Sequence, residues 1–258
     1  MVDRREDRRF GASDTYDGRA ADALVRLLDL PRVEIYDTVT STLDAAHALA
    51  ESGAPAGTLV IAEQQTAGRG RSGRSWTSAA GAGIWLTLLE RPRDGSAIET
   101  LSLRVGLRAA RALDRWTSTP VQLKWPNDLY VDGAKLAGVL TEARWREERL
   151  EWVAIGLGVN LIAPHDLPAA ALRANTSRVQ VLSELVPALR AAAAATGQLT
   201  PREITEFAAR DLARGRRCRL PTPGAVAGID PRGNLLVTTP AGTTACRSGS
   251  LVLEEDTA

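Results

Sequence analysis

Long apolar runs and clustered cysteines are both missing from this chain of 258 residues. No run approaches the roughly 18 consecutive apolar residues of a membrane span, and the charged start, residues 1–17, has no stretch resembling a secretory signal. The two cysteines, Cys218 and Cys246, form no metal-type cluster. We therefore expect a cytoplasmic protein with no membrane partner and no tightly bound structural metal.

An excess of charge of one sign is absent as well. Lys and Arg number 32 against 31 Asp and Glu, so the formal net charge is only +1. Proteins that bind nucleic acids generally carry a marked basic excess, and we therefore expect no specific DNA partner. The hydrophobic content of 44% is sufficient for a core, and the length predicts one large or two modest domains.

Lysine is nearly absent. Lys124 and Lys135 are the only lysines among the 32 basic residues. Codon bias toward arginine explains most of this skew, but it does not explain why the two lysines lie close together beside one motif. An ammonium group is a compact charge with a movable proton, which a guanidinium cannot imitate. We therefore interpret the pair as functional.

The most specialised segment is Gly68–Trp76, which reads Gly-Arg-Gly-Arg-Ser-Gly-Arg-Ser-Trp. Glycine lets the backbone bend tightly and approach a ligand. Each guanidinium offers a fork of donors that matches phosphate or carboxylate oxygens. A solvated basic turn is the alternative, and the strands expected on both sides disfavour it. The segment predicts an anion-binding loop, with a phosphate chain as the expected ligand.

The pattern of apolar residues predicts an α+β domain followed by a small β-rich domain. In the first part, strands are predicted at 32–36, 58–62, 83–89, 121–124, 129–131, 136–141 and 150–157, and helices at 19–28, 42–50, 101–116, 179–195 and 201–213. Short strands then follow at 217–220, 225–229, 235–239, 243–247 and 251–253. We expect a mobile tail with a short helix over 1–30, the main domain over 31–214 and a barrel over 215–258.

A second motif is Lys124-Trp125-Pro126-Asn127-Asp128, followed by Lys135-Leu136-Ala137-Gly138. Pro126 removes a backbone donor and stiffens the corner between two strands. Asn127 and Asp128 follow at a strand edge, where a carboxylate could hold Mg²⁺ near a phosphate. A simple Asx turn is the alternative, and it is weakened by the arginine loop in the same domain.

With these motifs the chain resembles the biotin protein ligases, in particular the monofunctional type without a DNA-binding domain. Gly68–Trp76, Lys124–Asp128, Lys135–Gly138 and Gly156–Asn160 occur in the order and spacing of that family, and the resemblance covers residues 31–255. It implies a catalytic domain related to class II aminoacyl-tRNA synthetases, with a mixed sheet and flanking helices, and a C-terminal SH3-like barrel.

The resemblance also implies a reaction in two steps. The carboxylate of biotin attacks the α-phosphate of ATP, which comes with Mg²⁺, and this gives biotinyl-5′-AMP and pyrophosphate. A lysine of the biotin carboxyl carrier protein or domain of a carboxylase then attacks the anhydride and releases AMP. The implied assembly is a monomer or weak homodimer.

Site residues follow from the same resemblance. Lys135, Arg71 and Arg69 are the implied catalytic residues, with Lys135 bridging the reacting carboxyl oxygen and the α-phosphate. The implied biotin-binding residues are Ser41, Thr42, Gln65, Gly68, Arg69, Gly70, Arg71, Lys135, Gly138 and Gly156. The implied ATP-binding residues are Arg71, Arg74, Trp76, Asn127, Lys135 and Asn160. Asp128 is a candidate Mg²⁺ ligand. Two of these residues have an alternative role: Ser41 could be only a helix cap, and Trp76 could be only a buried core residue.

Two other functions remain open. A lipoate-protein ligase shares the adenylation chemistry, although the tight glycine-arginine loop favours biotin. A biotin-sensing DNA-binding repressor is disfavoured, because the N-terminal segment is too short for a winged helix. The chain also departs from the family at Ser72, at Leu43 and at Gly249-Ser250-Leu251. We expect the last departure to affect contacts between barrel and acceptor, not adenylation.

Overall fold

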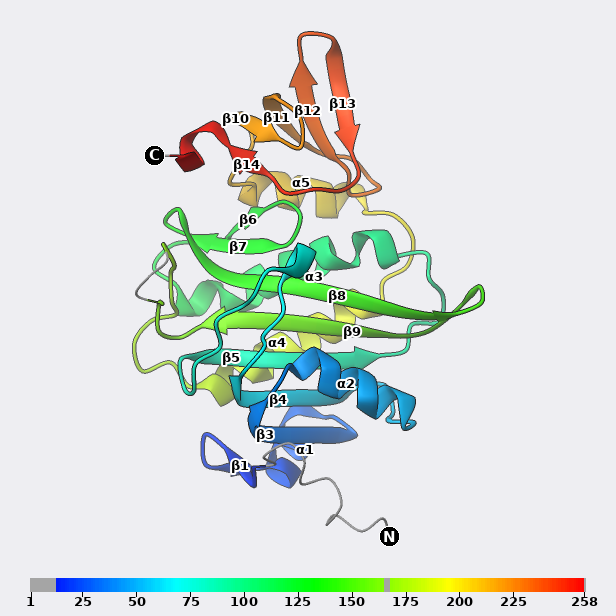
Figure 1. Ribbon diagram of the computed structural model, residues 1–258, viewed down its shortest axis with the longest axis vertical. Helices are drawn as coiled ribbons and strands as arrows, with labels where there is room; N and C mark the ends of the chain where they lie inside the picture. Colours follow the sequence, from blue (N-terminus) through cyan, green and yellow to red (C-terminus); the bar gives the residue numbers. More distant parts are fainter. Residues whose placement is uncertain (1–12, 165–167, 258) are drawn as a thin grey trace.

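A seven-stranded mixed sheet forms the centre of the protein (Figure 1). The computed structural model describes residues 13–164 and 168–257. In spatial order the strands are β3 (Arg32–Val39), β4 (Thr58–Gln65), β5 (Gly83–Glu90), β9 (Arg149–Asn160), β8 (Ala134–Arg146), β7 (Asp128–Val131) and β6 (Gln122–Lys124). β3 and β4 pair in parallel, and each further neighbouring pair is antiparallel. The predicted α+β class with a mixed sheet is confirmed.

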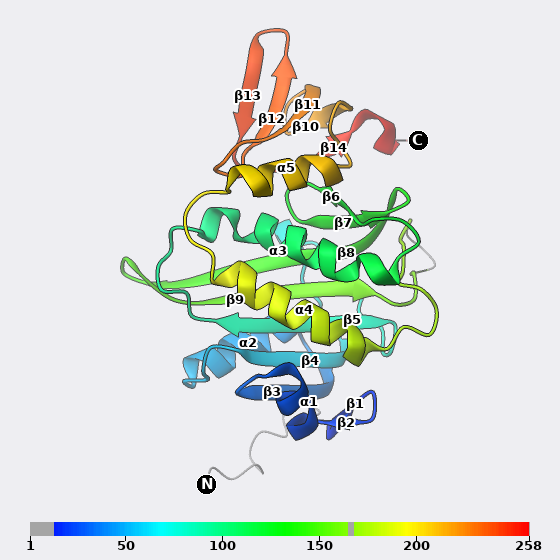
Figure 2. The same ribbon diagram turned by 180° about the vertical axis from the view of Figure 1, so that it is seen from behind.

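Helices cover both faces of this sheet. α2 (Thr42–Glu51) lies on the face seen in Figure 1, and α3 (Ile98–Leu113) and α4 (Arg178–Ala193) lie on the face seen in Figure 2. Because β5 is covered on both sides, it is buried along nearly its whole length. None of the described helices combines the length and the apolar character needed to cross a membrane.

Residues 13–31, which precede β3, are packed rather than tail-like. Two short strands, β1 (Thr15–Tyr16) and β2 (Arg19–Ala20), form a hairpin before the predicted helix, which is α1 (Ala21–Leu28). Tyr16 and Leu24 are fully buried in the main core. The prediction of a tail over residues 1–30 therefore does not hold for residues 13–30, because apolar side chains in this segment pack on the domain. Residues 1–12 lie outside the described residues.

The C-terminal part is a five-stranded antiparallel sheet, drawn in orange and red in Figure 1. It follows α5 (Pro201–Arg210) and contains, in spatial order, β13 (Gly242–Cys246), β12 (Leu235–Thr239), β11 (Gly224–Ile229), β10 (Arg217–Leu220) and β14 (Val252–Leu253). Within the described residues, β13 and β14 are its two edges. The SH3-like barrel and the boundary near Gly215 therefore stay predictions.

The predicted elements are present with shifted ends. β8 extends to Arg146, well beyond the predicted 136–141, and the prediction stopped short because the added residues are largely charged and are exposed toward the end of the strand. The helix predicted over 201–213 ends at Arg210. Three short 3₁₀ turns complete the described structure: Arg71–Gly73, Asp114–Trp116 and Glu254–Thr257.

Candidate active site

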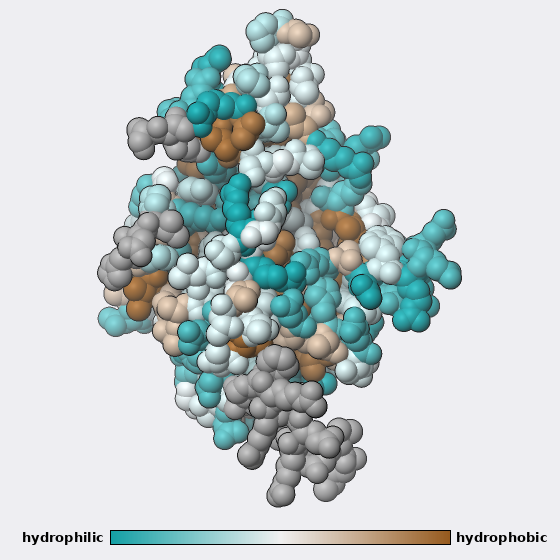
Figure 3. All heavy atoms as spheres, in the orientation of Figure 1, coloured by the Kyte–Doolittle hydropathy of each residue, from teal (hydrophilic) through white to brown (hydrophobic). Residues whose placement is uncertain are grey.

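A cavity of about 310 Å³ lies where the first turn of α2, the loop 68–76, the strands β7 to β9 and the segment 250–252 meet. Figure 3 shows this face of the molecule, on which hydrophilic side chains surround hydrophobic ones near the centre. The cavity has two chemically different parts. We call the part around Thr42 and Gln65 the amide end, and the part around Arg71, Arg74 and Lys135 the cationic end.

Short hydrogen bonds connect the residues of the amide end. Gln65 Oε1 accepts from the backbone nitrogen of Thr42 at 2.8 Å and from its hydroxyl at 3.1 Å. Gln65 Nε2 donates to Ser78 Oγ at 2.7 Å, and Thr87 Oγ1 donates to Thr42 Oγ1 at 2.9 Å. The network fixes which end of the Gln65 amide is the acceptor. A ligand therefore meets polar groups whose orientation is already set.

Ser41 is the N-cap of α2, as its alternative role predicted. Its hydroxyl accepts from the backbone nitrogen of Leu43 at 3.3 Å, and its side chain is buried. Ser41 and Thr42 both line the cavity. Capping and a position at the cavity are thus compatible for this hydroxyl.

The loop 68–76 folds back on itself as a narrow hairpin. The nitrogen of Trp76 donates to the carbonyl of Gly68 at 2.8 Å, and the nitrogen of Gly70 donates to the carbonyl of Arg74 at 2.8 Å. Gly73 at the tip has a φ of +74°, which favours glycine. A Cβ on Gly68 would overlap the Trp76 carbonyl. The glycines therefore permit the turn that carries the three arginines.

Arg71 and Arg74 extend from this hairpin toward the C-terminal segment. Arg71 Nη1 donates to Asn127 Oδ1 at 3.4 Å and to the Gly249 carbonyl at 3.4 Å. Arg74 Nη2 donates to Ser250 Oγ at 3.0 Å. Burial lowers the pKa of the Arg71 guanidinium, and the nearby Asp128 carboxylate opposes that shift. The segment 249–251 thus contacts the loop arginines at the cavity, and its expected effect on the acceptor and not on adenylation stays a prediction.

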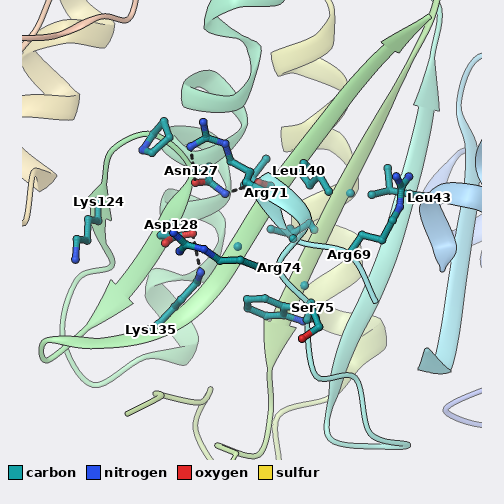
Figure 4. Close-up of a pocket in the computed structure, with 18 of the residues that line it drawn as sticks. Leu43, Arg69, Arg71, Arg74, Ser75, Lys124, Asn127, Asp128, Lys135 and Leu140 are labelled. Carbon is teal, nitrogen blue, oxygen red and sulfur yellow. Dashed lines mark hydrogen bonds and ion pairs between the residues drawn. The ribbon is translucent and has the colours of Figure 1, made fainter. Parts of the chain in front are cut away.

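Lys135 lies beside Asp128 at the cationic end (Figure 4). Its Nζ is 2.8 Å from Asp128 Oδ1 and 5.1 Å from the centre of the Trp76 ring. The pairing of β7 with β8 places Asp128 opposite Gly138 and so brings the carboxylate next to Lys135. The other lysine, Lys124, lies over the Tyr130 ring at 5.5 Å and points away from this pair.

Trp76 lies over two glycines of the sheet. A Cβ on Gly158 would be 2.5 Å from Trp76 Nε1, and a Cβ on Gly138 would be 3.1 Å from Trp76 Cζ3. Trp85 contacts the ring edge-on at a centroid distance of 6.5 Å. Trp76 is only half-buried, so the alternative of a core tryptophan is wrong. Gly158 was missed as a site residue, although its alternation with Gly156 on one strand was a signal.

Most of the predicted site residues line this one cavity. They are Ser41, Thr42, Gln65, Arg69, Gly70, Arg71, Arg74, Trp76, Asn127, Asp128, Lys135, Gly138 and Gly156. Gly68 lies at the base of the hairpin, where its carbonyl accepts from the backbone nitrogen of Trp76. Asn160 is buried beside the cavity, where its Nδ2 donates to the carbonyls of Lys135 at 3.3 Å and Ala170 at 3.1 Å.

No cluster of three or more His, Cys, Asp or Glu side chains that could hold a metal occurs among the described residues. Asp128 is a single carboxylate next to an ammonium group. Such a residue fits a magnesium ion that is held mainly by phosphates and water, and it does not form a protein cage.

Known proteins are similar in sequence to large parts of this chain. A Mycobacterium tuberculosis protein named biotin--[acetyl-CoA-carboxylase] ligase is 34% identical over 214 residues, which cover 76% of this chain and 79% of that protein. The Bacillus subtilis bifunctional ligase/repressor BirA is 38% identical over 154 residues, which cover 58% of this chain and 47% of that protein. The chain thus spans about half the length of the bifunctional Bacillus relatives.

A solved structure shows the same fold. The biotin protein ligase from Aquifex aeolicus in complex with biotin and ATP superimposes with a TM-score of 0.68 at 25% identity, and the match covers 87% of this chain and 99% of that chain. A family model also matches residues 35–160, which contain the amide end, the loop and the Lys135 strand. The chain belongs to the biotin/lipoate A/B protein ligase family.

Proposed function

We propose that this protein is an ATP-dependent ligase that activates biotin as biotinyl-5′-AMP and transfers it to a lysine of a biotin carboxyl carrier protein or domain. The observation that carries the proposal is the cavity itself, which joins an amide end of fixed hydrogen bonds to a cationic end with two arginines and a lysine. The names of the relatives and the biotin and ATP in the Aquifex aeolicus structure support the same function.

The amide end would hold biotin. A ureido ring carries both donors and acceptors, which the polar groups of Ser41, Thr42 and Gln65 can match. Gly138 and Gly156 line the same cavity without side chains and leave room for the fused rings and the chain that carries the carboxyl group. This end would therefore bind biotin with its carboxylate toward the cationic end.

The cationic end would stabilise the charge that develops when the carboxylate attacks the α-phosphate. Lys135 would bridge the carboxyl oxygen and the phosphate, Arg71 would contact both, and Arg69 would contact the carboxylate. Asn127 Oδ1 accepts a long hydrogen bond from Arg71, at 3.4 Å. Fixed donors of this kind act in the transition state without a cost of reorganisation.

The nucleotide would lie along the loop 68–76. The half-buried Trp76 ring offers a flat surface for the adenine, with Asn160 behind it, and Arg74 would contact the pyrophosphate side. Magnesium would come with ATP as part of the co-substrate. The Asp128 carboxylate would be the protein group that coordinates it. Closure of the loop would keep water from the acyl-adenylate until the acceptor lysine arrives.

The same proposal includes an assignment of the two domains to known fold types. We take residues 31–214 as a catalytic domain of the class II aminoacyl-tRNA synthetase type, and residues 215–258 as an SH3-like module. The C-terminal antiparallel sheet and its contacts with Arg71 and Arg74 support a module that helps to form the cavity. The partner would be the carrier of acetyl-CoA carboxylase or a related enzyme.

The test is formation of the acyl-adenylate from purified protein, ATP, Mg²⁺ and either biotin or lipoate, followed by transfer to a carrier domain. We expect biotinyl-AMP and carrier modification with biotin, and little product with lipoate. A preference for lipoate would instead establish the lipoate ligase alternative. Tight, sequence-specific binding in a gel-shift assay would support the repressor alternative, which the balanced charge of the chain disfavours.

A further inference from the structure

Arg69 differs from the other two arginines of the loop, because carboxylates bind it. Its Nη2 is 2.8 Å from Glu142 Oε2 and 3.1 Å from Asp44 Oδ1. Figure 4 shows that the side chain points away from Asp128 and Lys135, on the opposite side from Arg71 and Arg74. The base of the loop is therefore fastened to β8 through Glu142 and to the first turn of α2 through Asp44.

The Glu142 carboxylate is itself held by a histidine. His47 Nε2 lies 2.9 Å from Glu142 Oε2, and Trp152 Nε1 donates to His47 Nδ1 at 3.0 Å. An indole N–H can only donate, so Nδ1 is an acceptor and the ring proton of a neutral His47 is on Nε2. His47 thus donates to Glu142 in a fixed tautomer.

The series of contacts starts at Trp152, whose side chain is buried and therefore held in place. It is 5% exposed, and the guanidinium of Arg91 lies 5.5 Å from the centre of its ring. Contacts therefore run from β9 through α2 and β8 to the arginine loop. The buried indole of Trp152 fixes the orientation of the His47 ring. His47 in turn fixes the position of the Glu142 carboxylate, which fixes the position of the Arg69 guanidinium.

Both carboxylate contacts of Arg69 use the same terminal nitrogen, Nη2, whereas a guanidinium has five N–H donors in a planar fork. Arg69 lines the cavity while it is held in this way. The remaining donors can therefore bind the carboxyl group of a ligand without release of Glu142.

We propose that Glu142 is a positioning residue that acts through Arg69, and that His47 orients it. The inference rests on the proposed function. Glu142 and Asp44 hold the guanidinium on the biotin side of the cavity, so that the loop stays over the acyl-adenylate. The role is distinct from that of Arg71 and Lys135, which lie on the phosphate side.

The test measures the release rate of preformed biotinyl-AMP and the KM for each substrate in Glu142→Gln. We expect release to become about fivefold to twentyfold faster and the KM for biotin to rise similarly, while the KM for ATP changes less than twofold. In an Arg69→Ala background, Glu142→Gln should have no further effect, because residues that act through one contact are not additive.

Two His47 variants separate orientation from packing. Glutamine can accept from Trp152 and donate to Glu142, whereas leucine can do neither, so His47→Gln should retain adenylate release near the wild-type rate and His47→Leu should resemble Glu142→Gln. The control is Glu184→Gln on α4, on the opposite face of the sheet, which removes a carboxylate that lies 3.0 Å from Arg115.

The outcomes distinguish the two proposals. A wild-type protein that makes no biotinyl-AMP would overturn the proposed function. A wild-type protein that makes it, together with unchanged release in Glu142→Gln, equal effects of His47→Gln and His47→Leu, or additive effects of Glu142→Gln and Arg69→Ala, would overturn the positioning role alone.

Discussion

The two ends of the cavity are held together in different ways. At the amide end, hydrogen bonds of 2.7 to 3.1 Å join Thr42, Gln65, Ser78 and Thr87, and all of these residues except Gln65 are buried. At the cationic end, Arg71 makes two contacts at 3.4 Å, and the contacts of Arg74 at 3.0 Å and of Lys135 at 2.8 Å involve exposed or half-buried side chains. Buried, mutually oriented bonds are costly to break, and bonds that are long or open to solvent are more easily exchanged for a ligand.

The difference separates two tasks. The amide end is part of the folded core and presents a ready-made surface for a neutral polar ring. The cationic end uses exposed or half-buried guanidiniums whose protein contacts can be replaced by phosphate oxygens. Substitutions at the amide end should therefore affect both stability and biotin binding, and substitutions at the cationic end should affect chemistry with little change in stability.

The largest effect is expected for Lys135→Ala. Loss of one fixed donor at developing charge typically costs about 10²–10³-fold in kcat, and we expect this loss in biotinyl-AMP formation. Lys124→Ala is the matched comparison, since it removes the other lysine, which also lines the cavity but lies over Tyr130 and not beside Asp128. We expect it to cost less than about tenfold. Equal losses in the two variants, measured by adenylate formation, would contradict the roles assigned here.

A smaller effect is expected for Gly158→Ala. Its Cβ would be 2.5 Å from Trp76 Nε1, so the ring must move from its place over β8 and β9. Stacking of a base on an aromatic ring contributes about 1–3 kcal/mol, and we expect the KM for ATP to rise about tenfold or more. The control is Gly106→Ala in α3, whose Cβ would meet Leu123 at an ordinary 3.6 Å. Similar KM values for both variants would count against Trp76 as the adenine surface.

Thr42→Val compares the two ends directly. The change leaves the buried Thr87 hydroxyl without its acceptor, while Gln65 Oε1 keeps the backbone N–H of residue 42, and we expect the free energy of unfolding to fall by about 1–3 kcal/mol and the KM for biotin to rise. Arg74→Ala, at the exposed side of the loop, should change the free energy of unfolding by less than about 0.5 kcal/mol. Chemical denaturation measures both. If Arg74→Ala lowers the free energy of unfolding more than Thr42→Val does, the amide end is not the part of the cavity that stabilises the fold.

The smallest effect on activity is expected for Asp211→Asn, which lies at neither end. Burial raises the pKa of the Asp211 carboxyl from 3.8 to about 6. Between these values the folded state binds more protons than the unfolded state, so the free energy of unfolding falls as the pH rises through this window and remains lower above it. We expect Asp211→Asn to raise the free energy of unfolding at neutral pH by roughly 1–3 kcal/mol.

The KM values for biotin and ATP should not change in that variant, because the substitution alters stability without touching either end. Denaturation curves at acidic and neutral pH provide the measurement. A difference in the free energy of unfolding between wild type and Asp211→Asn that stays the same in the two conditions would show that Asp211 ionises normally.

Composition and spacing were sufficient to find the residues that act in local segments. The loop 68–76, the Lys124–Asp128 motif and Lys135 are each visible in a few consecutive letters, and the structure brings them to one cavity. The strands that carry them are also predictable, since buried apolar runs mark them. Their exposed ends, such as the last residues of β8, have no such mark.

Contacts between distant segments could not be predicted in this way. Ser250 lies 176 residues after Arg74, and Glu142 lies 73 residues after Arg69. Both contacts depend on how the C-terminal sheet and β8 are placed on the loop. The β1–β2 hairpin was missed for another reason, because strands of two residues are too short to show a period.

The central claim is that one cavity binds biotin at the amide end and the phosphate at the cationic end. The most direct measurement is a crystal structure of the protein with biotinyl-5′-AMP. The account predicts the ureido ring within hydrogen-bonding distance of Thr42 or Gln65 and the phosphate in contact with Arg71 and Lys135. An adenylate bound in the reverse orientation, or outside this cavity, would contradict it.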